Sequence, residues 1–464
     1  MSRSSIMGLP ARFVRNKPGS SCGNCRKRRV HCDMGSPQCS RCVTKGINCP
    51  GYAVSLLRWK SVDHHVESAR RAQRPASMCV SISPPFHILE AGGNDGSFLD
   101  RYFAKVAPIL STSMATDSRN PFGIHLRQFL SQNGAMRHTL ISIGAIQDSF
   151  FNKSSLHDAW IHRATACRLL RRDLDKGQGG EGMMYSVVLL GLTENSFDTQ
   201  NEKPYHVHAA RALVREHQKL GLPGPTALAN AVLWMEVQAC FVYDNNDYDF
   251  DTRPRLFASS DGEARDPLLL LQDWGPLFQL VGRAACTARK AMQGGITVNL
   301  QPTAQSIVTA LATIQICEDP AFNNGQVSDA HLMGEAHRLA AMLLLYHYFP
   351  QLDTLEHKTS EDTNVGFFKG LLDRTMRCLR AIPLSSSVWH VARIPMLSAG
   401  QFARNADDRD FVRTAMREVT KRVSMPHVDL PMALLEECWK SNDRGTMVTW
   451  MEIMASRGLR ALMS

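Results

Sequence analysis

The sequence lacks the features that define several large classes of protein. Its longest apolar runs, such as residues 339–346, are far shorter than the roughly 18 residues that a membrane-spanning helix needs. Residues 1–21 contain no apolar stretch typical of a secretory signal, so we expect none. No Gly-Lys pair occurs, which excludes a P-loop, and no His-Glu-x-x-His motif is present. Alternation of apolar and polar residues, which indicates a half-buried strand, is scarce.

Acidic residues are almost missing from the first 75 positions. This segment holds 15 Lys and Arg against 3 acids, a net charge of +12, whereas the remaining residues hold 38 bases and 40 acids. The overall apolar content of 44% and charged content of 21% are ordinary for globular proteins and exclude wholesale disorder. A short basic segment attached to a near-neutral body predicts a polyanionic partner for that segment alone.

Cysteine is abundant but unevenly placed. Six of the 13 cysteines fall within residues 22–49, and the other seven are scattered singly. In the absence of a secretory signal, such a cluster favours metal binding over disulfide bonds. The cluster consists of two copies of Cys-x2-Cys-x6-Cys joined by six residues, and its members are Cys22, Cys25, Cys32, Cys39, Cys42 and Cys49.

Six thiolates can fill the coordination of two zinc ions only if two sulfurs are shared. Zinc in a structural site takes four tetrahedral ligands, and a single zinc would leave two cysteines unused. Because the cluster is duplicated, the first cysteines of the two halves, Cys22 and Cys39, are the natural bridging pair. The two remaining cysteines of each half then complete one zinc each. A segment this small buries little apolar area, so metal binding should supply its folding energy.

The residues of this cluster resemble a known family. The string Cys-Gly-Asn-Cys-Arg-Lys-Arg-Arg-Val-His-Cys-Asp at residues 22–33, with Cys39-Ser-Arg-Cys42 and Cys49, is similar to the fungal binuclear zinc cluster (Zn2Cys6) transcription factors. The body resembles, more loosely, the helical fungal transcription-factor regulatory domain, on segments 100–103 and 208–213. The resemblance implies a small zinc-stabilised domain, with two short helices around two zincs, followed by a large all-α domain.

Four consecutive cations, at residues 26–29, lie between ligands of the first half. A helix that zinc pins at this place can enter the major groove and present a cation to guanine O6 and N7. The resemblance implies base contacts to CGG triplets from Arg28 and Arg29. It also implies contacts to backbone phosphates from four further cations: Arg26, Lys27, Arg41 and Lys45.

From residue 98 onward the apolar residues recur at helical spacing. One predicted buried helix face consists of Trp160, Ala164, Cys167, Leu170 and Leu174. Further helices are predicted over residues 268–292, 331–349, 364–382, 407–423 and 446–463. We therefore expect one all-α regulatory unit, or two closely packed lobes, over residues 98–464. Before it we expect a disordered basic arm at 1–21, the Zn2Cys6 DNA-binding domain at 22–49 and a linker at 50–97.

Two other patterns are compatible with chemistry but have simpler interpretations. His206 and His208 stand two residues apart and do not share a helix face, so we do not expect a metal site there. Residues 434–439 and 450–454 mix acidic with large apolar side chains, as activation segments do. We favour core helices for both segments.

Together these observations predict a nuclear, sequence-specific DNA-binding RNA polymerase II transcription factor that is not an enzyme. Its expected partners are double-stranded DNA with CGG-like sites and the transcription machinery or co-regulators, with no membrane. A small-molecule effector is expected for the helical unit, and the resemblance implies pathway-specific control, for example of secondary metabolism. Homodimerisation stays open, because residues 50–74 supply only about one and a half heptads.

Three alternatives remain at this point. The first is a zinc-stabilised interaction adaptor or co-repressor that does not read bases. The second is an enzyme within residues 98–464, which would require a clustered acid, base and nucleophile. The third concerns residues 1–17 alone, whose Arg- and Ser-rich, acid-free composition is also typical of a mitochondrial transit peptide.

Overall fold

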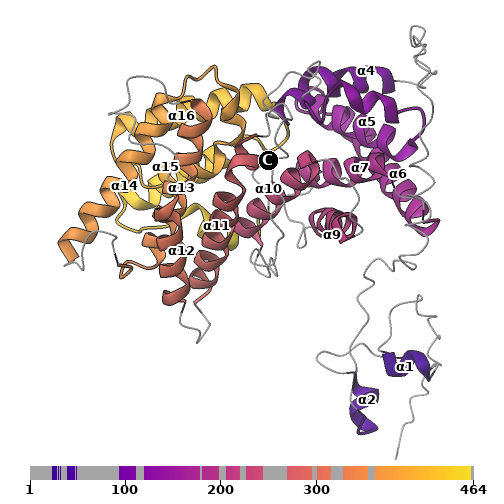
Figure 1. The fold of residues 1–464 in the computed structure, drawn as a ribbon, viewed down its shortest axis with the longest axis horizontal. Helices are drawn as coiled ribbons and strands as arrows, with labels where there is room; N and C mark the ends of the chain where they lie inside the picture. Colours follow the sequence, from indigo (N-terminus) through magenta and orange to yellow (C-terminus); the bar gives the residue numbers. More distant parts are fainter. Residues whose placement is uncertain are drawn as a thin grey trace, which may run out of the picture. The chain divides into compact units, whose positions relative to one another are not determined.

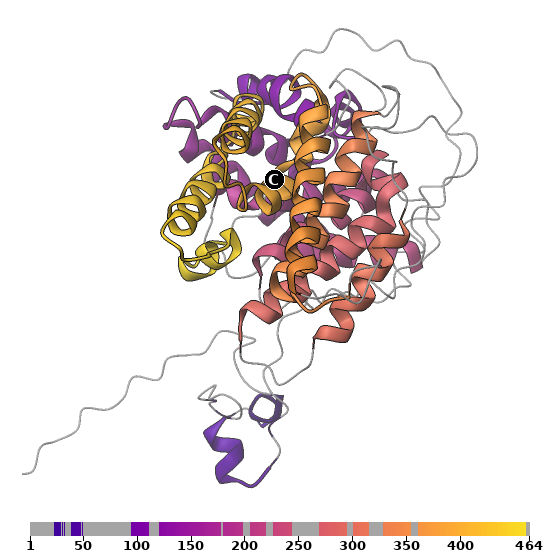
Figure 2. The same cartoon turned by 90° about the vertical axis from the view of Figure 1, so that its left-hand side faces the viewer.

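The structure is a computed structural model that divides the chain into two compact units, Met1–Arg74 and Pro75–Ser464 (Figures 1 and 2). Each unit is described by itself. The described residues are 23–28, 30, 32, 39–47, 49, 94–110, 120–177, 180–197, 205–219, 226–243, 269–294, 300–314, 328–353 and 361–460. The predicted arm at 1–21 and most of the predicted linker lie outside these residues.

The described residues of the first unit form two short helices, α1 (Gly23–Lys27) and α2 (Ser40–Thr44), which contact each other. Its described interior consists of five buried cysteines, against which only the half-buried Ile47 packs. A core without Leu, Val or Phe buries little apolar surface, so the hydrophobic effect alone contributes little to the stability of this unit.

The second unit is all-helical over the residues described, with no strand among them. Its helices in the first half are α4 (Asp95–Arg101), η1 (Tyr102–Val106), η2 (Ala107–Ile109), η3 (Ile124–Phe129), α5 (Gly134–Asp148), α6 (Ser155–Asp175), α7 (Glu181–Leu192), α8 (Glu194–Phe197), α9 (Tyr205–Lys219) and α10 (Thr226–Val242). The second half contains α11 (Leu269–Met292), α12 (Gln301–Thr313), α13 (Asp329–Tyr348), α14 (Glu361–Ala381), η4 (Ser387–Val391), α15 (Arg393–Gly400), α16 (Ala406–Val423), α17 (Leu430–Asp443) and α18 (Trp450–Ser456). The expected all-α architecture is confirmed. Because α10 contacts α7 and α9 as well as α11, it joins the two halves (Figure 1).

Helix α13 forms the centre of the second half. Every residue from Leu332 to Tyr346 is buried, because α11, α14 and α15 pack around it. A helix that is enclosed on all sides needs its polar side chains paired. Glu335 meets this requirement with two arginines: Arg338 on the same helix donates to it twice, at 2.7 Å each, and Arg374 of α14 lies 2.9 Å away.

Most of the long predicted helices are present with small shifts at their ends. Helices α11, α13, α14 and α16 correspond to the predicted segments, and α4 begins three residues inside the predicted linker. The single helix predicted over 446–463 is wrong. Thr449 and Glu452 form a capping box that starts α18 at Trp450, and Gly458, at φ +64°, follows its end at Ser456.

The face predicted for α6 is also wrong in part. Leu170 is buried as expected, but Trp160 is 44% exposed and Ala164 is exposed. The buried positions of α6 are Ser155, Ala159, Arg163, Ala166 and Leu170. Arg163 belongs to the inner face because its guanidinium donates to the Leu190 carbonyl at 3.3 Å, so a charged residue occupies a place that an apolar pattern does not reveal.

Helices α4 and α5 approach each other at a glycine. A Cβ added to Gly144 of α5 would lie 1.9 Å from the Phe98 carbonyl oxygen of α4, so only glycine fits at this position. Phe98 and the following Tyr102 are buried beside it. The packing of the first half of the unit therefore depends on the absence of one side chain.

The two C-terminal segments considered for activation are part of the core. Leu434, Leu435 and Trp439 of α17 and Trp450 and Met451 of α18 are at most 1% exposed. This burial confirms the preferred interpretation as core helices. None of the described helices is long and apolar enough to span a bilayer.

Candidate metal centre and nucleic-acid interface

The duplication of the cysteine cluster is repeated in its backbone structure. Helix α2 begins directly after Cys39 and carries Cys42 at its third position, and α1 begins after residue 22 and carries Cys25 at its third position. Cys39 is the N-cap of α2, and its Sγ accepts the Cys42 backbone N–H at 3.4 Å. A thiolate at a helix N-terminus is stabilised by the free N–H groups and by the helix dipole.

The five described cysteines of the unit form two groups that share one member. The sulfurs of Cys25, Cys32 and Cys39 lie within 4.8 Å of one another, and so do those of Cys39, Cys42 and Cys49. None of the five is in a disulfide, and the Sγ atoms of Cys25 and Cys39 are 3.7 Å apart. Two sulfurs bound to the same tetrahedral zinc at 2.3 Å lie about 3.8 Å apart. The arrangement therefore fits two metal ions with Cys39 between them.

The donor set also fits zinc chemically. The two groups contain only buried thiols, with no carboxylate or histidine, and soft thiolates in tetrahedral groups select zinc among the common cellular ions. Each group offers three of the four ligands that zinc needs. Cys22, the predicted second bridge, lies outside the described residues.

The predicted DNA-contacting cations lie on the surface of the unit where the structure describes them. Lys27 and Arg28, at the end of α1, and Arg41 and Lys45, on and after α2, are all exposed. Arg26 is part of α1, although its side chain is outside the description, and Arg29 lies outside the described residues. Neither helix has an acidic residue in its first turn, so the described surface of the two helices is basic.

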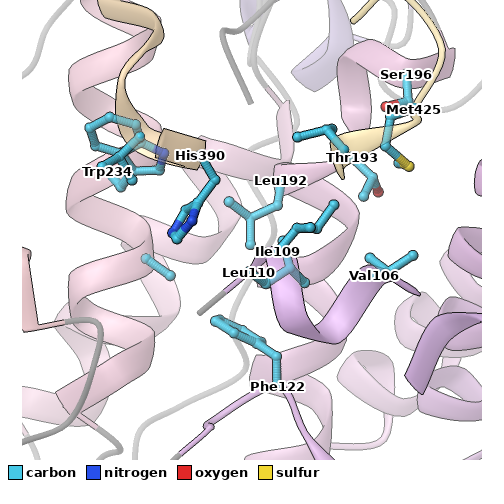
Figure 3. Close-up of a pocket in the computed structure, with 13 residues that line it drawn as sticks. Val106, Ile109, Leu110, Phe122, Leu192, Thr193, Ser196, Trp234, His390 and Met425 are labelled. Atoms are coloured by element: carbon cyan, nitrogen blue, oxygen red, sulfur yellow. The ribbon is translucent and has the colours of Figure 1, made fainter. Parts of the chain in front are cut away.

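A cavity of about 90 Å³ lies inside the helical unit (Figure 3). Its walls come from η1 and η2, the junction of α7 and α8, α10, η4 and the residues that follow α16. Most of the lining is apolar, and Figure 3 shows Trp234 and His390 on one side, with Thr193, Ser196 and Met425 on the other. Pockets that bind small molecules combine apolar walls with a few polar groups in this way.

His390 supplies the titratable group of this cavity. Its pKa is lowered to about 4, mainly by burial and also by the charges of Arg393 and Arg422, while a backbone hydrogen bond to Ser387 opposes them. The imidazole is therefore neutral at pH 7 and has one donor and one acceptor. Sequence reasoning missed this cavity because its lining residues come from segments almost 320 positions apart in the chain.

The pair His206 and His208 behaves as the sequence predicted. His206 faces inward from α9, whereas His208 is exposed, so the two rings do not converge on a metal ion. Sequence reasoning nevertheless missed the neighbours of His206, which come from α6 and α8.

Comparison with known proteins gives two family matches. The family model described as the fungal specific transcription factor domain matches residues 97–464. The model described as the fungal Zn(2)-Cys(6) binuclear cluster domain matches residues 20–58. No solved structure matches the chain.

Two curated proteins of Saccharomyces cerevisiae are similar over short stretches. Arginine metabolism regulation protein II is 40% identical over 50 residues, which is 11% of this chain and 6% of that protein. Sterol uptake control protein 2 is 27% identical over 112 residues, which is 22% of this chain and 12% of that protein. The matched stretches thus span about a tenth or less of the length of these relatives.

Proposed function

The chain belongs to the fungal-specific transcription factor family, with a Zn(2)-Cys(6) domain that binds two zinc ions, and we propose that it is a pathway-specific regulator that reads CGG-like triplets in the nucleus. The observation that carries this proposal is the combination of a thiol-only metal centre with exposed cations on the helices that bear its ligands. Zinc fixes the helices, and the cations then face outward toward a polyanion.

In this proposal Cys22 and Cys39 bridge the two zincs, and the other four cysteines complete them in pairs. The presence of Cys39 in both sulfur groups supports its role as a bridge. The matching position of α1 after residue 22 supports the same role for Cys22, by the internal duplication. The domain would extend over residues 22–49, between the arm at 1–21 and the linker at 50–97.

Base reading is assigned to Arg28 and Arg29, and phosphate contacts to Arg26, Lys27, Arg41 and Lys45. An arginine can donate two hydrogen bonds to O6 and N7 of one guanine, and each such pair contributes about 1–3 kcal/mol of discrimination. The phosphate contacts carry no sequence information but position the domain. Arg28, at the end of α1, is exposed as base contact requires.

The double substitution Arg28→Ala with Arg29→Ala tests this assignment in the full zinc-loaded chain. We expect loss of the preference for a CGG duplex over a scrambled duplex in fluorescence anisotropy, while zinc content stays at two per chain. Arg171→Ala with Arg172→Ala, at two exposed positions of α6, removes the same charge and should keep the preference. Retention of the preference in the first variant would contradict base reading and favour an adaptor or co-repressor.

One yeast relative is named for regulation of arginine metabolism and the other for control of sterol uptake, and the first name supports a metabolic pathway as the target of regulation. Secondary metabolism is the pathway class that we propose. We further propose that the helical unit contacts the transcription machinery and has no enzymatic role in this regulation. Sedimentation of the full chain at several concentrations would distinguish a monomer from a homodimer.

We also propose that the cavity receives a small apolar effector with one polar group, which His390 would bind. At about 90 Å³ it is smaller than the engineered cavity of about 150 Å³ that accepts benzene, so the effector is small or enters as the walls move. Pyrrole is a suitable probe, because it combines a small apolar ring with one N–H donor. We expect pyrrole to raise the melting temperature of the chain, and Ala231→Phe, which fills the cavity, to abolish the rise. Ala164→Phe, at an exposed position of α6, should retain it. Equal rises in both variants would contradict the site.

A further inference from the structure

Three side chains of the helical unit form a linear arrangement of nucleophile, base and carboxylate. The Sγ of Cys167, on α6, lies 3.8 Å from Nε2 of His206, on α9. The Nδ1 atom of the same imidazole lies 3.1 Å from Oε1 of Glu194, on α8. The three residues come from three helices, so the fold and not local sequence brings them together.

Nδ1 of His206 faces two groups, the Glu194 carboxylate at 3.1 Å and the Arg163 guanidinium at 3.4 Å. Glu194 is only 5% exposed, and we assign the Nδ1 proton to the shorter contact, because a carboxylate accepts it. Nε2 is then the acceptor that faces the thiol of Cys167. Proton transfer from sulfur to this nitrogen gives a thiolate next to an imidazolium, which the carboxylate stabilises from the other side. Gly191 of α7 lies beside this histidine, since a Cβ there would be in ordinary contact with Cβ of His206, at 3.4 Å.

His206 and Arg163 both favour the thiolate form of Cys167. The hydrogen bond and charge of His206, with the charge of Arg163, lower the pKa of Cys167, although burial and Glu194 oppose them. Bonds to Cys167 and Glu194 raise the pKa of His206 against its burial and Arg163. These three groups, from α6, α8 and α9, are the charged neighbours of the thiol.

The thiol is half-buried and lies near an aromatic surface. Trp160 precedes Cys167 by two turns on α6, is 44% exposed, and packs edge-on against Phe197 with ring centroids 5.0 Å apart. The guanidinium of Arg163 lies over the ring of Phe197 at 4.6 Å. The exposed indole of Trp160 therefore offers an apolar reagent a surface on the same helix as the polarised thiol, whereas a small polar oxidant gains nothing from it.

We propose that Cys167 is a covalent modification site for apolar α,β-unsaturated carbonyl compounds. The sulfur electron pair forms a bond to the β-carbon, and the π electrons of the C=C bond move to form an enolate. The imidazolium of His206 returns the proton to the enolate, so that S–H adds across C=C with no oxidant and no leaving group. The thioether product carries no leaving group, so the reaction stops at one adduct.

The test uses the full zinc-loaded chain and limiting N-ethylmaleimide, an α,β-unsaturated carbonyl probe, with peptide mass spectrometry to follow each cysteine. Cys286 is the matched internal control, because it is the other half-buried cysteine outside a disulfide among those described. We expect Cys167 to react at least about tenfold faster than Cys286 at pH 7, since thiolate population controls the rate. Equal rates would overturn the proposal.

Two variants separate the role of the imidazole from general exposure. His206→Gln should slow the reaction at Cys167 by about tenfold, whereas His208→Gln, at an exposed position two residues away, should leave it unchanged. Unchanged reactivity in His206→Gln would overturn the assigned role.

If circular dichroism shows that His206→Gln is unfolded, the pH profile of the wild-type chain decides. We expect the rate at Cys167 to fall less between pH 8 and pH 6 than the rate at Cys286, and equal falls at the two thiols would overturn the proposal. Faster reaction of Cys167 with hydrogen peroxide than with the maleimide would overturn the electrophile class.

Discussion

The two units of this chain differ in the source of their folding free energy. In the described part of the first unit, five cysteines and Ile47 form the interior, whereas in the second unit a single helix, α13, buries fifteen consecutive residues. Burial of that many side chains contributes tens of kcal/mol before conformational entropy is subtracted. The described residues of the first unit bury no comparable apolar set, so we expect zinc–thiolate bonds to supply its folding energy. We therefore expect the fold of the first unit, and not that of the helical unit, to depend on metal.

Removal of zinc should produce the largest difference between the units. We expect a chelator to unfold the first unit completely, because binding free energy of structural zinc is its folding free energy. Trypsin should then cleave after Arg28, Arg41 and Lys45, while the helical unit stays intact, as mass spectrometry of the fragments would show. Cys42→Ser should have the same effect without chelator, and Cys438→Ser, at a buried position of α17, should not. Persistent protection of Arg41 after chelation would contradict the dependence on metal.

A substitution at a helix contact should produce the reverse pattern. Gly144→Ala places a methyl group against the Phe98 carbonyl, which we expect to cost about 1–3 kcal/mol or more in the free energy of unfolding of the helical unit. The zinc content should remain two per chain. Gly366→Ala is the matched control on α14, where a Cβ meets nothing within 4 Å, and it should be neutral or stabilising by up to about 1 kcal/mol. Denaturant unfolding measures both, and equal effects would contradict the described packing.

The helical unit should lose stability in mild acid. Burial lowers the pKa of His337 and of His390 to about 4, whereas an unfolded histidine titrates near 6.5. Between these values the unfolded chain binds protons that the folded chain does not. Stability therefore falls as pH falls through this window, by about 1.4 kcal/mol per pH unit for each histidine.

Unfolding of the chelated chain at pH 7.5 and pH 5 would measure this slope without a contribution from zinc release. His337→Gln should reduce the slope, and His157→Gln, at an exposed position of α6, should preserve it. A slope that does not change in His337→Gln would show that this imidazole is not held neutral by burial.

The smallest expected effect concerns the start of α18. The Thr449 hydroxyl accepts the Glu452 backbone N–H at 3.2 Å, and the Glu452 carboxylate accepts the Thr449 N–H at 2.8 Å. Thr449→Ala should therefore cost about 1 kcal/mol in the free energy of unfolding, and Thr449→Ser, which keeps the hydroxyl, should cost less. Urea unfolding of the two variants gives the comparison, and equal losses would contradict a role for the hydroxyl.

The sequence predicted those features that depend on local spacing. The repeat of cysteines indicated a two-metal cluster because ligand spacing is set by a short backbone, and α11 and α13 were visible as long helix-favouring segments. The predicted helix over 446–463 was wrong because a cap at Thr449 divides a segment of uniform composition. The inner face of α6 was misjudged because Arg163 is buried through a contact with Leu190, which is remote in sequence.

The residues that line the cavity, and the pair formed by Cys167 and His206, are also remote from one another in the sequence. They come together only when helices from different parts of the chain pack, and no single segment carries a pattern that predicts this packing. Which of the two cations, Arg28 or Lys27, contacts a base and which contacts a phosphate depends on the position of the DNA. Neither the spacing of the residues nor the fold of the chain contains that position.

The most direct test of metal-dependent base reading is selection of bound sequences from random duplex DNA. The full chain loaded with two zincs is compared with the same chain after chelation. We expect enrichment of a CGG triplet with the zinc-loaded chain only, and the number and spacing of triplets would give the number of copies bound. Absence of enrichment from a chain that holds two zincs would contradict sequence-specific reading by the cluster.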